Sequence, residues 1–405
     1  MKSLQILLLA AFVDMLGFAM VFPLLPFYAV RLGADAQVVG WMVASFSIAQ
    51  VASAPVWGRL SDRWGRRPAL LIGLLGSALA FSIFAFANAL WLLFAMRLVQ
   101  GGSGGTTGVM QAYIGDSVAP EDRAKALGWL SAATSGGVML GPAIGSLAWS
   151  LGSAAPGLIA ASLCLLNFLF ALRSLPESRP SPPAQPEGAG SGTTNRPAHE
   201  SVGKMFWATL RHPRGDVARL IWIYAVAMMA FSSLQGVLGL FLMNRFQLTE
   251  ANIGYVFVYL GALSVVLRAG VLGYLIHTLG EVRVMHLGAI LLAVGLGAYP
   301  LPGSFFMLLP VMALVPMGTA LLFPSASGLL SRRGPKHQLG QLYGVQQSFG
   351  GLARIVGPIW AGTAFSKLGP AVPFWVAGAI VAVVAFLVAQ VRPEPRSMAA
   401  ESVQA

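Results

Sequence analysis

The sequence predicts an all-α membrane protein in which twelve transmembrane helices form two pseudo-symmetric six-helix bundles. Three observations support this fold class: the composition, the length of the apolar runs and an internal repeat. The chain has 405 residues, of which 56% are hydrophobic and 10% are charged, and its mean hydropathy is +0.73. Water-soluble domains are typically about 45–50% apolar and about 25% charged. The predicted environment of this chain is therefore a lipid bilayer.

Twelve apolar runs each supply the roughly 20 residues that an α-helix needs to cross about 30 Å of hydrocarbon. Helices are predicted because their backbone hydrogen bonds are satisfied within the segment. The short polar links between runs predict antiparallel neighbours. The runs lie near 4–30, 37–57, 68–88, 91–114, 125–148, 155–174, 217–241, 252–276, 284–302, 305–330, 339–364 and 371–391.

One link between runs is longer than the others and is rich in Pro, Gly and Ser. It divides the chain into an N-terminal six-helix bundle (1–175), a cytoplasmic linker (176–216), a C-terminal six-helix bundle (217–391) and a cytoplasmic tail (392–405). The first part of the linker is predicted to be disordered. Near its end, "VGKMFWATLRHPRG" (202–215) is predicted as a short helix on the membrane surface.

The distribution of Lys and Arg predicts the orientation. If the N-terminus is cytoplasmic, the basic residues expected outside are Arg31, Arg245 and Lys367, and those inside the runs are Arg97, Arg268 and Arg354. All the other Lys and Arg residues fall on the cytoplasmic side, where positive charge accumulates. Both termini are therefore predicted to be cytoplasmic in an inner (plasma) membrane. "GRLSDRWGRRP" (58–68) is predicted as a tight cytoplasmic turn between helices 2 and 3.

Nucleic acid is not an expected partner, although the chain has 26 Lys and Arg against 14 Asp and Glu. The positive charges lie in short loops rather than on one polar face. The single cysteine, Cys164, lies in an apolar run and is predicted to be a buried thiol. No metal or cofactor motif is present, so neither is expected, and the protein is expected to be monomeric.

The two halves repeat each other at a nearly constant offset. "GWLSAATSGGVMLGPAIG" (128–145) aligns with "GVQQSFGGLARIVGPIWAG" (344–362), which places Gly128 on Gly344 and Pro142 on Pro358, 216 residues apart. "GRLSDRWGRRP" has a weaker copy in "GYLIHTLGEVR" (273–283), 215 residues further on. Such a repeat predicts two related halves with a transport site at their interface.

Four segments resemble motifs of the major facilitator superfamily. They are "GRLSDRWGRR" (58–67), "RLVQGGSGG" (97–105), "GGVMLGPAIG" (136–145) and "DMLGFAMVFPLLP" (14–26). The third is similar to the helix 5 motif of antiporters, and the fourth to the helix 1 pattern of drug/proton antiporters, including tetracycline-efflux proteins. The resemblance covers the chain outside the linker and implies the twelve-helix major facilitator fold.

The resemblance also implies two structural devices. The first motif is similar to a latch that joins the halves on the cytoplasmic side, with Asp62 against the end of a helix from the other half. Its members here are Gly58, Asp62, Arg63, Gly65 and Arg66. The second copy has Glu281 in place of Arg66, so the latch is expected mainly in the first half. In the helix 5 motif, Gly137, Gly141, Pro142 and Gly145 predict either close helix packing or a seal between the halves.

Charges inside membrane helices are costly and suggest function. Asp14 lies roughly 15 Å into the first run, and Arg97 roughly 9 Å into the fourth run from the outer side, at 1.5 Å per residue. They form either a neutralising structural pair or a proton-coupling pair. In the second case, a change in their separation during the transport cycle makes Asp14 take up and release a proton.

Arg268 and Arg354 have no membrane acid in the second half as a partner, unlike in tetracycline-efflux proteins, which carry a further acid there. They are predicted either to bind an anionic group or, for Arg354, to bond carbonyls freed by the kink at Pro358. The predicted substrate-binding residues are Phe18, Gln111, Gln235, Arg268, Gln346 and Arg354.

The resulting prediction is a secondary transporter that exports a small amphipathic compound in exchange for protons by alternating access. Its partners are then the substrate, protons and the lipid bilayer. The alternative is a facilitator or symporter of a small organic anion that uses Arg268 and Arg354. An enzyme is not expected, because the chain has no nucleophile–base pair, metal cluster or cofactor motif. A receptor is not favoured, because there is no sizeable soluble domain.

Overall fold

The structure is a computed structural model that describes residues 2–178, 202–213, 215–335 and 338–391. Within these residues the regular structure is helical and contains no strand. The chain divides into two compact units. The first comprises the described residues up to 197 together with 236–261, and the second comprises those of 198–235 together with 262–405. Most of the predicted linker (179–201) and the predicted tail (392–405) lie outside the described residues.

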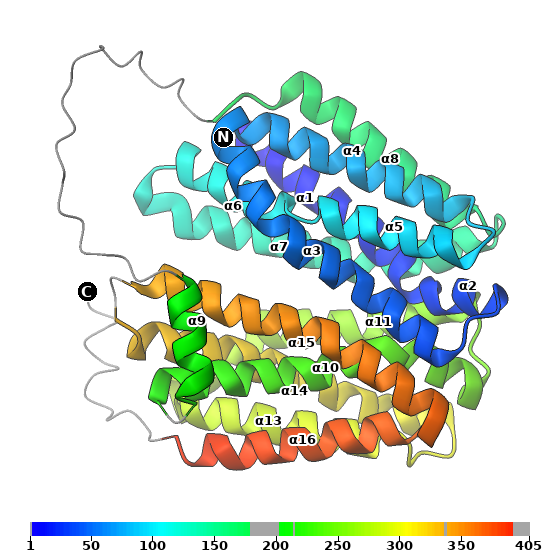
Figure 1. Ribbon diagram of the computed structural model, residues 1–405, viewed down its shortest axis with the longest axis vertical. Helices are drawn as coiled ribbons and strands as arrows, with labels where there is room; N and C mark the ends of the chain where they lie inside the picture. The colour runs from blue at the N-terminus through cyan, green and yellow to red at the C-terminus, as the bar shows by residue number, and fades with distance from the viewer. Residues whose placement is uncertain (1, 179–201, 214, 336–337, 392–405) are drawn as a thin grey trace. The chain divides into compact units, whose positions relative to one another are not determined.

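The first unit contains the first six predicted runs (Figure 1). Its elements are α1 (Lys2–Val21), the 3₁₀ turn η1 (Phe22–Leu24), α2 (Leu25–Arg31), α3 (Ala36–Trp64), α4 (Arg66–Ala85), α5 (Leu90–Ser103), α6 (Thr106–Ser117), α7 (Pro120–Trp149) and α8 (Ala155–Ser174). Residues 236–261, from the end of α10 and the start of α11, complete it. The most extensive packing inside this unit joins α1 to α7 and α4 to α8.

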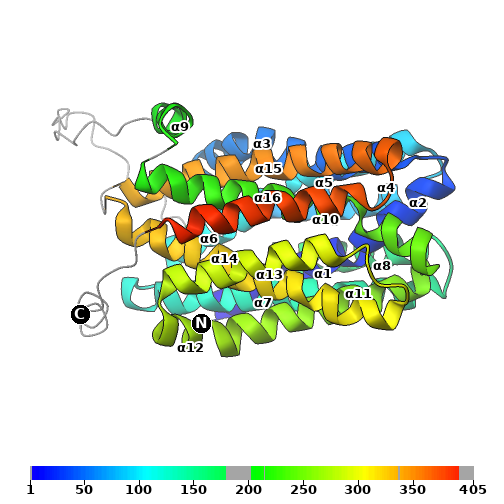
Figure 2. The same cartoon turned by 90° about the horizontal axis from the view of Figure 1, so that it is seen from below.

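The second unit contains most of the later runs. Its elements are α9 (Val202–Arg211), the first part of α10 (Asp216–Phe246), the end of α11 (Glu250–Val266), the π-helical turn η2 (Leu267–Val271), α12 (Leu272–Leu279), α13 (Glu281–Ala298), α14 (Phe305–Arg333), α15 (Leu339–Leu368) and α16 (Val372–Ala389). Figure 2 shows α13 next to α16, and α13 packs against both α14 and α16. The short helix predicted within 202–215 is present as α9, and its position on the membrane surface stays a prediction.

Nine helical segments in the described residues are long and apolar enough to cross a membrane. The three other predicted runs are helical too: 91–114 forms α5 and α6, 125–148 lies in α7, and 339–364 lies in α15. The twelve predicted runs are thus all found as helices, in agreement with the predicted fold class.

The fourth run is interrupted where the sequence predicted one helix. α5 ends at Ser103 and α6 begins at Thr106, with Gly104 and Gly105 between them. The indole of Trp57 on α3 donates a hydrogen bond of 2.5 Å to the carbonyl of Gly102 and occupies the space that a side chain at Gly105 would need. Glycine at 105 therefore lets α3 approach the chain closely at this break.

The predicted cytoplasmic turn at 58–68 is mostly helical. α3 continues through Trp64, and α4 begins at Arg66, so that Gly65 alone separates the two helices. Gly65 has φ +100°, a conformation that other residues adopt rarely. In the second unit Gly280 separates α12 from α13 with φ +83°. The two glycines occupy equivalent positions in the repeat, which therefore extends to backbone conformation.

The interface between α1 and α7 depends on glycine. A Cβ on Gly141 would lie 2.6 Å from the Cβ of Ala19 and 2.7 Å from the carbonyl oxygen of Leu16. Gly137 and Gly145 approach the backbone of α1 in the same way. Close backbone approach gives van der Waals contact, which drives helix association where lipid competes for apolar surface. The predicted close-packing role of these glycines agrees with this arrangement.

Candidate functional site

Asp14 is an acidic side chain buried in the interior of the first unit. It is 7% exposed. The hydroxyl of Ser77 on α4 donates a hydrogen bond of 2.9 Å to its Oδ1, and the hydroxyl of Thr106 on α6 donates one of 3.2 Å to its Oδ2. Both partners are neutral. Because an ionised carboxylate away from water is costly without a cation, proton uptake relieves this cost, and the carboxyl is suited to bind and release a proton.

The break between α5 and α6 places one of these partners. Thr106 is the first residue of α6, so the carboxylate of Asp14 lies beside the N-terminal end of that helix. Unpaired N–H groups and the helix dipole give such an end a partial positive charge. A continuous helix through 104–105 would have no end here. The local break therefore puts a partial positive charge beside the Asp14 carboxylate without a cationic side chain.

Arg97 on α5 is also buried, at 2% exposure, but it has other partners. Its Nη1 donates a hydrogen bond of 2.7 Å to Oε1 of Gln100. Its Nε and Nη2 each lie 3.4 Å from a carbonyl oxygen of α3, those of Met42 and Val43. The guanidinium lies 4.5 Å from the centroid of the Phe46 ring, close enough for a cation–π interaction.

Asp14 and Arg97 therefore do not form a pair in this structure. Each has neutral partners inside the first unit, and no ion pair joins them among the described residues. The expected neutralising pair between the first and fourth runs is not formed. The acid is left without a cation, which strengthens its suitability as a proton site.

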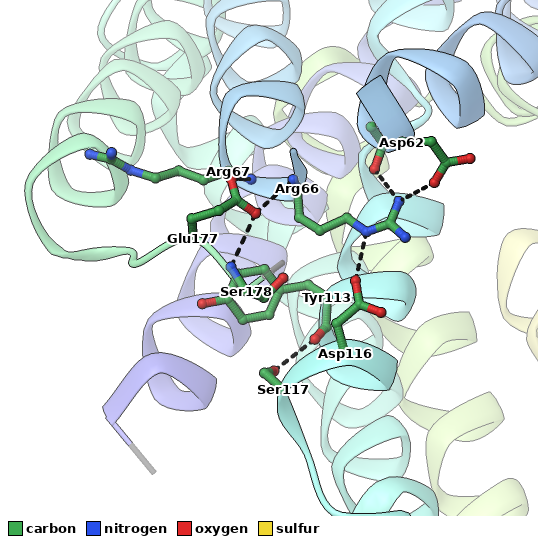
Figure 3. A network of polar contacts seen from close by, with 9 residues as sticks. Asp62, Arg66, Arg67, Tyr113, Asp116, Ser117, Glu177 and Ser178 are labelled. Atoms are coloured by element: carbon green, nitrogen blue, oxygen red, sulfur yellow. Dashed lines mark hydrogen bonds and ion pairs between the residues drawn. The ribbon is translucent and has the colours of Figure 1, made fainter. Parts of the chain in front are cut away.

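A polar network at the junction of α3 and α4 contains Asp62 and Arg66 of the predicted latch (Figure 3). Arg66 donates from Nη1 to Oδ1 of Asp62 at 2.9 Å and from Nε to Oδ2 of Asp116 on α6 at 2.8 Å. Its Nη1 also lies 2.7 Å from the hydroxyl of Ser61. Arg66 thus joins three helices of the first unit. The cross-half contact expected of Asp62 stays a prediction.

Glu177, directly after α8, caps the start of α4. Its Oε1 and Oε2 accept hydrogen bonds from the backbone N–H groups of Arg66 and Arg67 at 2.9 and 3.0 Å (Figure 3). These N–H groups have no partner inside the helix, and a carboxylate there also interacts favourably with the helix dipole. Gly65 makes room for it, because a Cβ at that position would lie 2.5 Å from a Glu177 oxygen.

The second unit holds a counterpart of the Arg66–Asp116 ion pair with the charges exchanged. The repeat offsets carry Arg66 onto Glu281 and Asp116 onto Arg332. Nη2 of Arg332 lies 3.1 Å from Oε1 of Glu281. The expectation that the latch lies mainly in the first half therefore missed this pair. Within the described parts of the two units, each has one ion pair of this kind, and the two pairs have opposite polarity.

Exchanging the charges of Arg66 and Asp116 tests whether this contact stabilises the first unit. Arg66→Asp and Asp116→Arg are each expected to lower the free energy of unfolding by about 1 kcal/mol, because the pair is partly exposed and screened. The double variant is expected to recover most of the loss. Thermal unfolding of the purified protein in detergent measures this, and losses that simply add in the double variant would contradict it. Arg63→Asp, which changes an exposed arginine near the same helix end, is the control.

Residues next to the helix 5 glycines contact α11 within the first unit. The Ser146 hydroxyl donates a hydrogen bond of 2.7 Å to the carbonyl of Glu250 and accepts one of 2.9 Å from the N–H of Gly254. It thereby bridges a carbonyl and an N–H four residues apart in the first turn of α11. Gly254 also meets the carbonyl of Pro142, and Glu250 forms an ion pair of 2.7 Å with Arg31.

The glycines expected to seal the halves therefore contact α1, and their neighbours contact α11. Gly137, Gly141 and Gly145 face the first helix of their own half, because their missing side chains fit the α1 backbone. Pro142 and Ser146 lie on the face of α7 that meets α11. The seal between the halves expected of Gly137, Gly141, Pro142 and Gly145 stays a prediction.

The predicted substrate residues are divided between the two units. Phe18 stacks on Phe22 at 5.7 Å and packs on Phe46 at 5.4 Å in the first unit, and Gln111 of that unit is exposed. In the second unit Gln235 is half-buried. Gln346 is 3% exposed; its Oε1 lies 3.4 Å from the Ser327 hydroxyl, and its Nε2 has no hydrogen-bond partner among the described residues.

Arg268 and Arg354 both belong to the second unit. Arg268 lies on the π-helical turn η2, and Arg354 lies one turn before Pro358 on α15. The carbonyls near that proline are bonded by serine hydroxyls of α10 instead: Ser232 donates to Ala353 at 3.0 Å. Among the described residues, no hydrogen bond from Arg354 to these carbonyls is formed.

The sequence matches a known protein family over nearly its whole length. The model of the Major Facilitator Superfamily matches residues 7–280 and 220–405. The chain belongs to the major facilitator superfamily. It is accordingly a transporter of a multi-pass membrane type and not an enzyme, as the sequence predicted.

Relatives within the superfamily include several resistance proteins. The chain is 31% identical over 388 residues to the class C tetracycline resistance protein of Escherichia coli, covering 93% of this chain and 94% of that one. It is 30% identical to the class D protein of Salmonella ordonez, covering 90% of both chains. It is 27% identical to multidrug resistance protein 2 of Bacillus subtilis, covering 94% of this chain and 93% of that one.

Solved structures confirm the fold. The human organic anion transporter MFSD10 (TETRAN) matches with a TM-score of 0.68 at 24% identity, and the nucleoside transporter NupG matches with a TM-score of 0.73 at 16% identity. Each match covers 96% of this chain and 99% of the other. Identities this low show the shared fold alone.

Several residues of the candidate sites are not predicted from the sequence. Ser77 and Thr106 are ordinary residues of apolar runs, and nothing in the sequence links them to Asp14. The Glu281–Arg332 pair, in contrast, has a usable signal. The repeat offset places residues of opposite charge at the positions equivalent to Arg66 and Asp116. The two ion pairs are therefore predictable from the sequence repeat.

Proposed function

We propose that the protein exports a small amphipathic compound in exchange for protons, with Asp14 as the proton-binding group. The observation that carries the proposal is the burial of this carboxyl among neutral hydroxyls. A cycle that opens the site to each side of the membrane in turn offers the same acid to two solutions of different pH. The names of the tetracycline and multidrug resistance relatives support export of a drug-like compound.

The available energy is sufficient for one proton per neutral substrate. Moving one elementary charge across 100 mV releases about 2.3 kcal/mol, and each unit of pH gradient adds about 1.4 kcal/mol. A hundredfold concentration gradient of a neutral compound costs about 2.7 kcal/mol, since a tenfold ratio corresponds to about 1.4 kcal/mol. A single buried carboxyl is therefore enough to couple the two movements.

The orientation completes the proposal. The excess of Lys and Arg on one side predicts cytoplasmic termini in an inner membrane. The Arg66 and Glu281 ion pairs then lie on the cytoplasmic side. The Ser146–Glu250–Gly254 contact then lies on the outer side. Alternating access requires the two sides to open in turn, and we assign closure of the cytoplasmic side to the latch predicted at Asp62.

Proton movement in everted membrane vesicles tests the function. After respiration acidifies the vesicle interior, addition of tetracycline or of a lipophilic dye is expected to release protons from the vesicles, as reported by a pH-sensitive fluorophore. Vesicles without the protein are the control. Compound movement that persists unchanged after an uncoupler collapses the gradient would indicate a facilitator instead. Binding without any flux would indicate a receptor.

A further inference from the structure

Gly350 on α15 lies against side chains of the second unit. A Cβ at this position would lie 3.0 Å from Cε1 of Tyr224, 3.8 Å from Nη1 of Arg354 and 3.8 Å from Oε1 of Gln347. Tyr224 belongs to α10 and is buried, whereas Gln347 is exposed. A tyrosine ring, a guanidinium and an amide therefore meet around a position that carries no side chain.

Two further aromatic rings pack in sequence beside Tyr224. The ring of Tyr224 packs edge to face on Phe323 of α14 at 5.2 Å, and Phe323 packs in the same way on Phe231 of α10 at 6.2 Å. These three rings come from two helices of the same unit. Flat apolar surfaces of this kind favour stacking with planar ligands.

The second basic group approaches the same tyrosine from another helix. Arg268 lies on η2, where the helix widens for one π turn between α11 and α12. Such turns are uncommon and occur frequently at functional sites. Both Arg268 and Arg354 are within electrostatic range of the Tyr224 hydroxyl. The Tyr224 hydroxyl and both guanidiniums are therefore close enough to interact electrostatically.

Neither arginine has a compensating acid among the residues that the structure describes. Across the described ranges, no ion pair or hydrogen bond is formed by the guanidinium of Arg268 or Arg354. Arg268 is exposed, and Arg354 is half-buried. A guanidinium at membrane depth faces a water-filled cavity or a partner, because exposure to lipid is costly. Two such groups beside one tyrosine create a positive potential that an anion neutralises.

We propose that this cluster is the charge-recognition site of the transporter, and that the transported compound is a planar amphipathic organic anion. Its carboxylate binds Arg268, Arg354 and the Tyr224 hydroxyl, and its apolar body lies on the Phe323 ring. Charge-assisted hydrogen bonds from arginine to a carboxylate are among the stronger polar contacts in proteins. This inference rests on the proposed transport function and specifies its substrate class.

Binding of three matched probes tests the charge preference. We choose 2-naphthoate, its neutral amide and 2-naphthylmethylammonium, which share one ring system and differ in charge. Equilibrium dialysis against the protein in lipid nanodiscs, corrected with empty nanodiscs, gives each Kd. The anion is expected to bind at least tenfold more tightly than the amide, and the cation most weakly.

Substitutions then locate the site. Arg268→Gln and Arg354→Gln are each expected to raise the Kd of 2-naphthoate at least tenfold and to change that of the amide less than threefold. Gly350→Ala presses a methyl group against the Tyr224 ring and is expected to weaken all three probes. Arg283→Gln, at an exposed arginine of α13, is the matched control and is expected to change none of them. Equal affinities for the three probes, or an unchanged Kd for the anion in both arginine variants, would overturn the proposal.

The same assay separates this proposal from the proton-coupling proposal. Asp14 lies in the other unit, so Asp14→Asn is expected to retain anion binding. Anion-selective binding without proton movement would keep the recognition site and remove the antiport mechanism. Proton release with a cation but not with 2-naphthoate would keep the antiport mechanism and remove the anion-recognition site.

Discussion

Asp14→Asn is expected to abolish proton-driven export while leaving the protein folded. The asparagine oxygen retains an acceptor for the Ser77 or Thr106 hydroxyl and nearly the same volume, but the side chain has no proton to exchange. Uphill accumulation is expected to disappear, because the gradient no longer contributes its roughly 2.3 kcal/mol per 100 mV. Uptake into everted vesicles with an imposed pH gradient measures the effect.

Two further measurements make this result specific. Downhill exchange of labelled for unlabelled compound needs no proton and is expected to continue in Asp14→Asn. Asp122→Asn removes an exposed acid at the start of α7 and is expected to leave coupling intact. If Asp14→Asn still accumulates compound against a gradient at the wild-type level, this carboxyl is not the coupling group.

Gly145→Ala is expected to lower the stability of the protein substantially. Its Cβ would lie 3.0 Å from the carbonyl carbon of Met20 and closer still to the oxygen, so α1 and α7 must move apart. Overpacking typically costs about 1–3 kcal/mol, and the neighbour here is backbone, which has no rotamer to change. Alanine favours the helix by about 1 kcal/mol over glycine. The clash is therefore expected to exceed the gain.

Gly128 on the same helix provides the matched comparison. Nothing lies within 4 Å of the position that its Cβ would occupy. Gly128→Ala is accordingly expected to leave the melting temperature unchanged or to raise it. Melting of both variants in the same detergent distinguishes the two positions, and a loss of similar size in each would show that helix propensity and the α1 contact have been misjudged.

Hydropathy predicted the helices because bilayer thickness constrains each crossing segment. The twelve runs were all found as helices, and the left-handed glycines at 65 and 280 agree with the repeat offset. The break at Gly104–Gly105 was not predicted, since an apolar run with glycines has the same hydropathy whether or not it is continuous. It depends on Trp57, which lies on another helix.

The chemistry of the sites was predicted less completely. The sequence identified Asp14 and Arg97 as intramembrane charges, but their partners depend on how α1, α3, α4 and α6 pack. A pair inferred from depth alone ignores rotation about each helix axis. For Arg268 and Arg354, in contrast, the absence of acids in the second-half runs was visible in the sequence. The approach of Tyr224 to Gly350 was not visible in the sequence.

Helix contacts made by glycines tolerate substitution less well than contacts made by aromatic side chains. At Gly137, Gly141 and Gly145 every substitution adds atoms against the α1 backbone, so random change can only loosen this helix pair. Aromatic positions such as Phe231 and Phe323 can shrink, grow or become polar by degrees. Selection for a new transported compound is thus expected to change the aromatic rings of the second unit. In a saturation library, the α7 glycines are expected to be nearly invariant among functional clones.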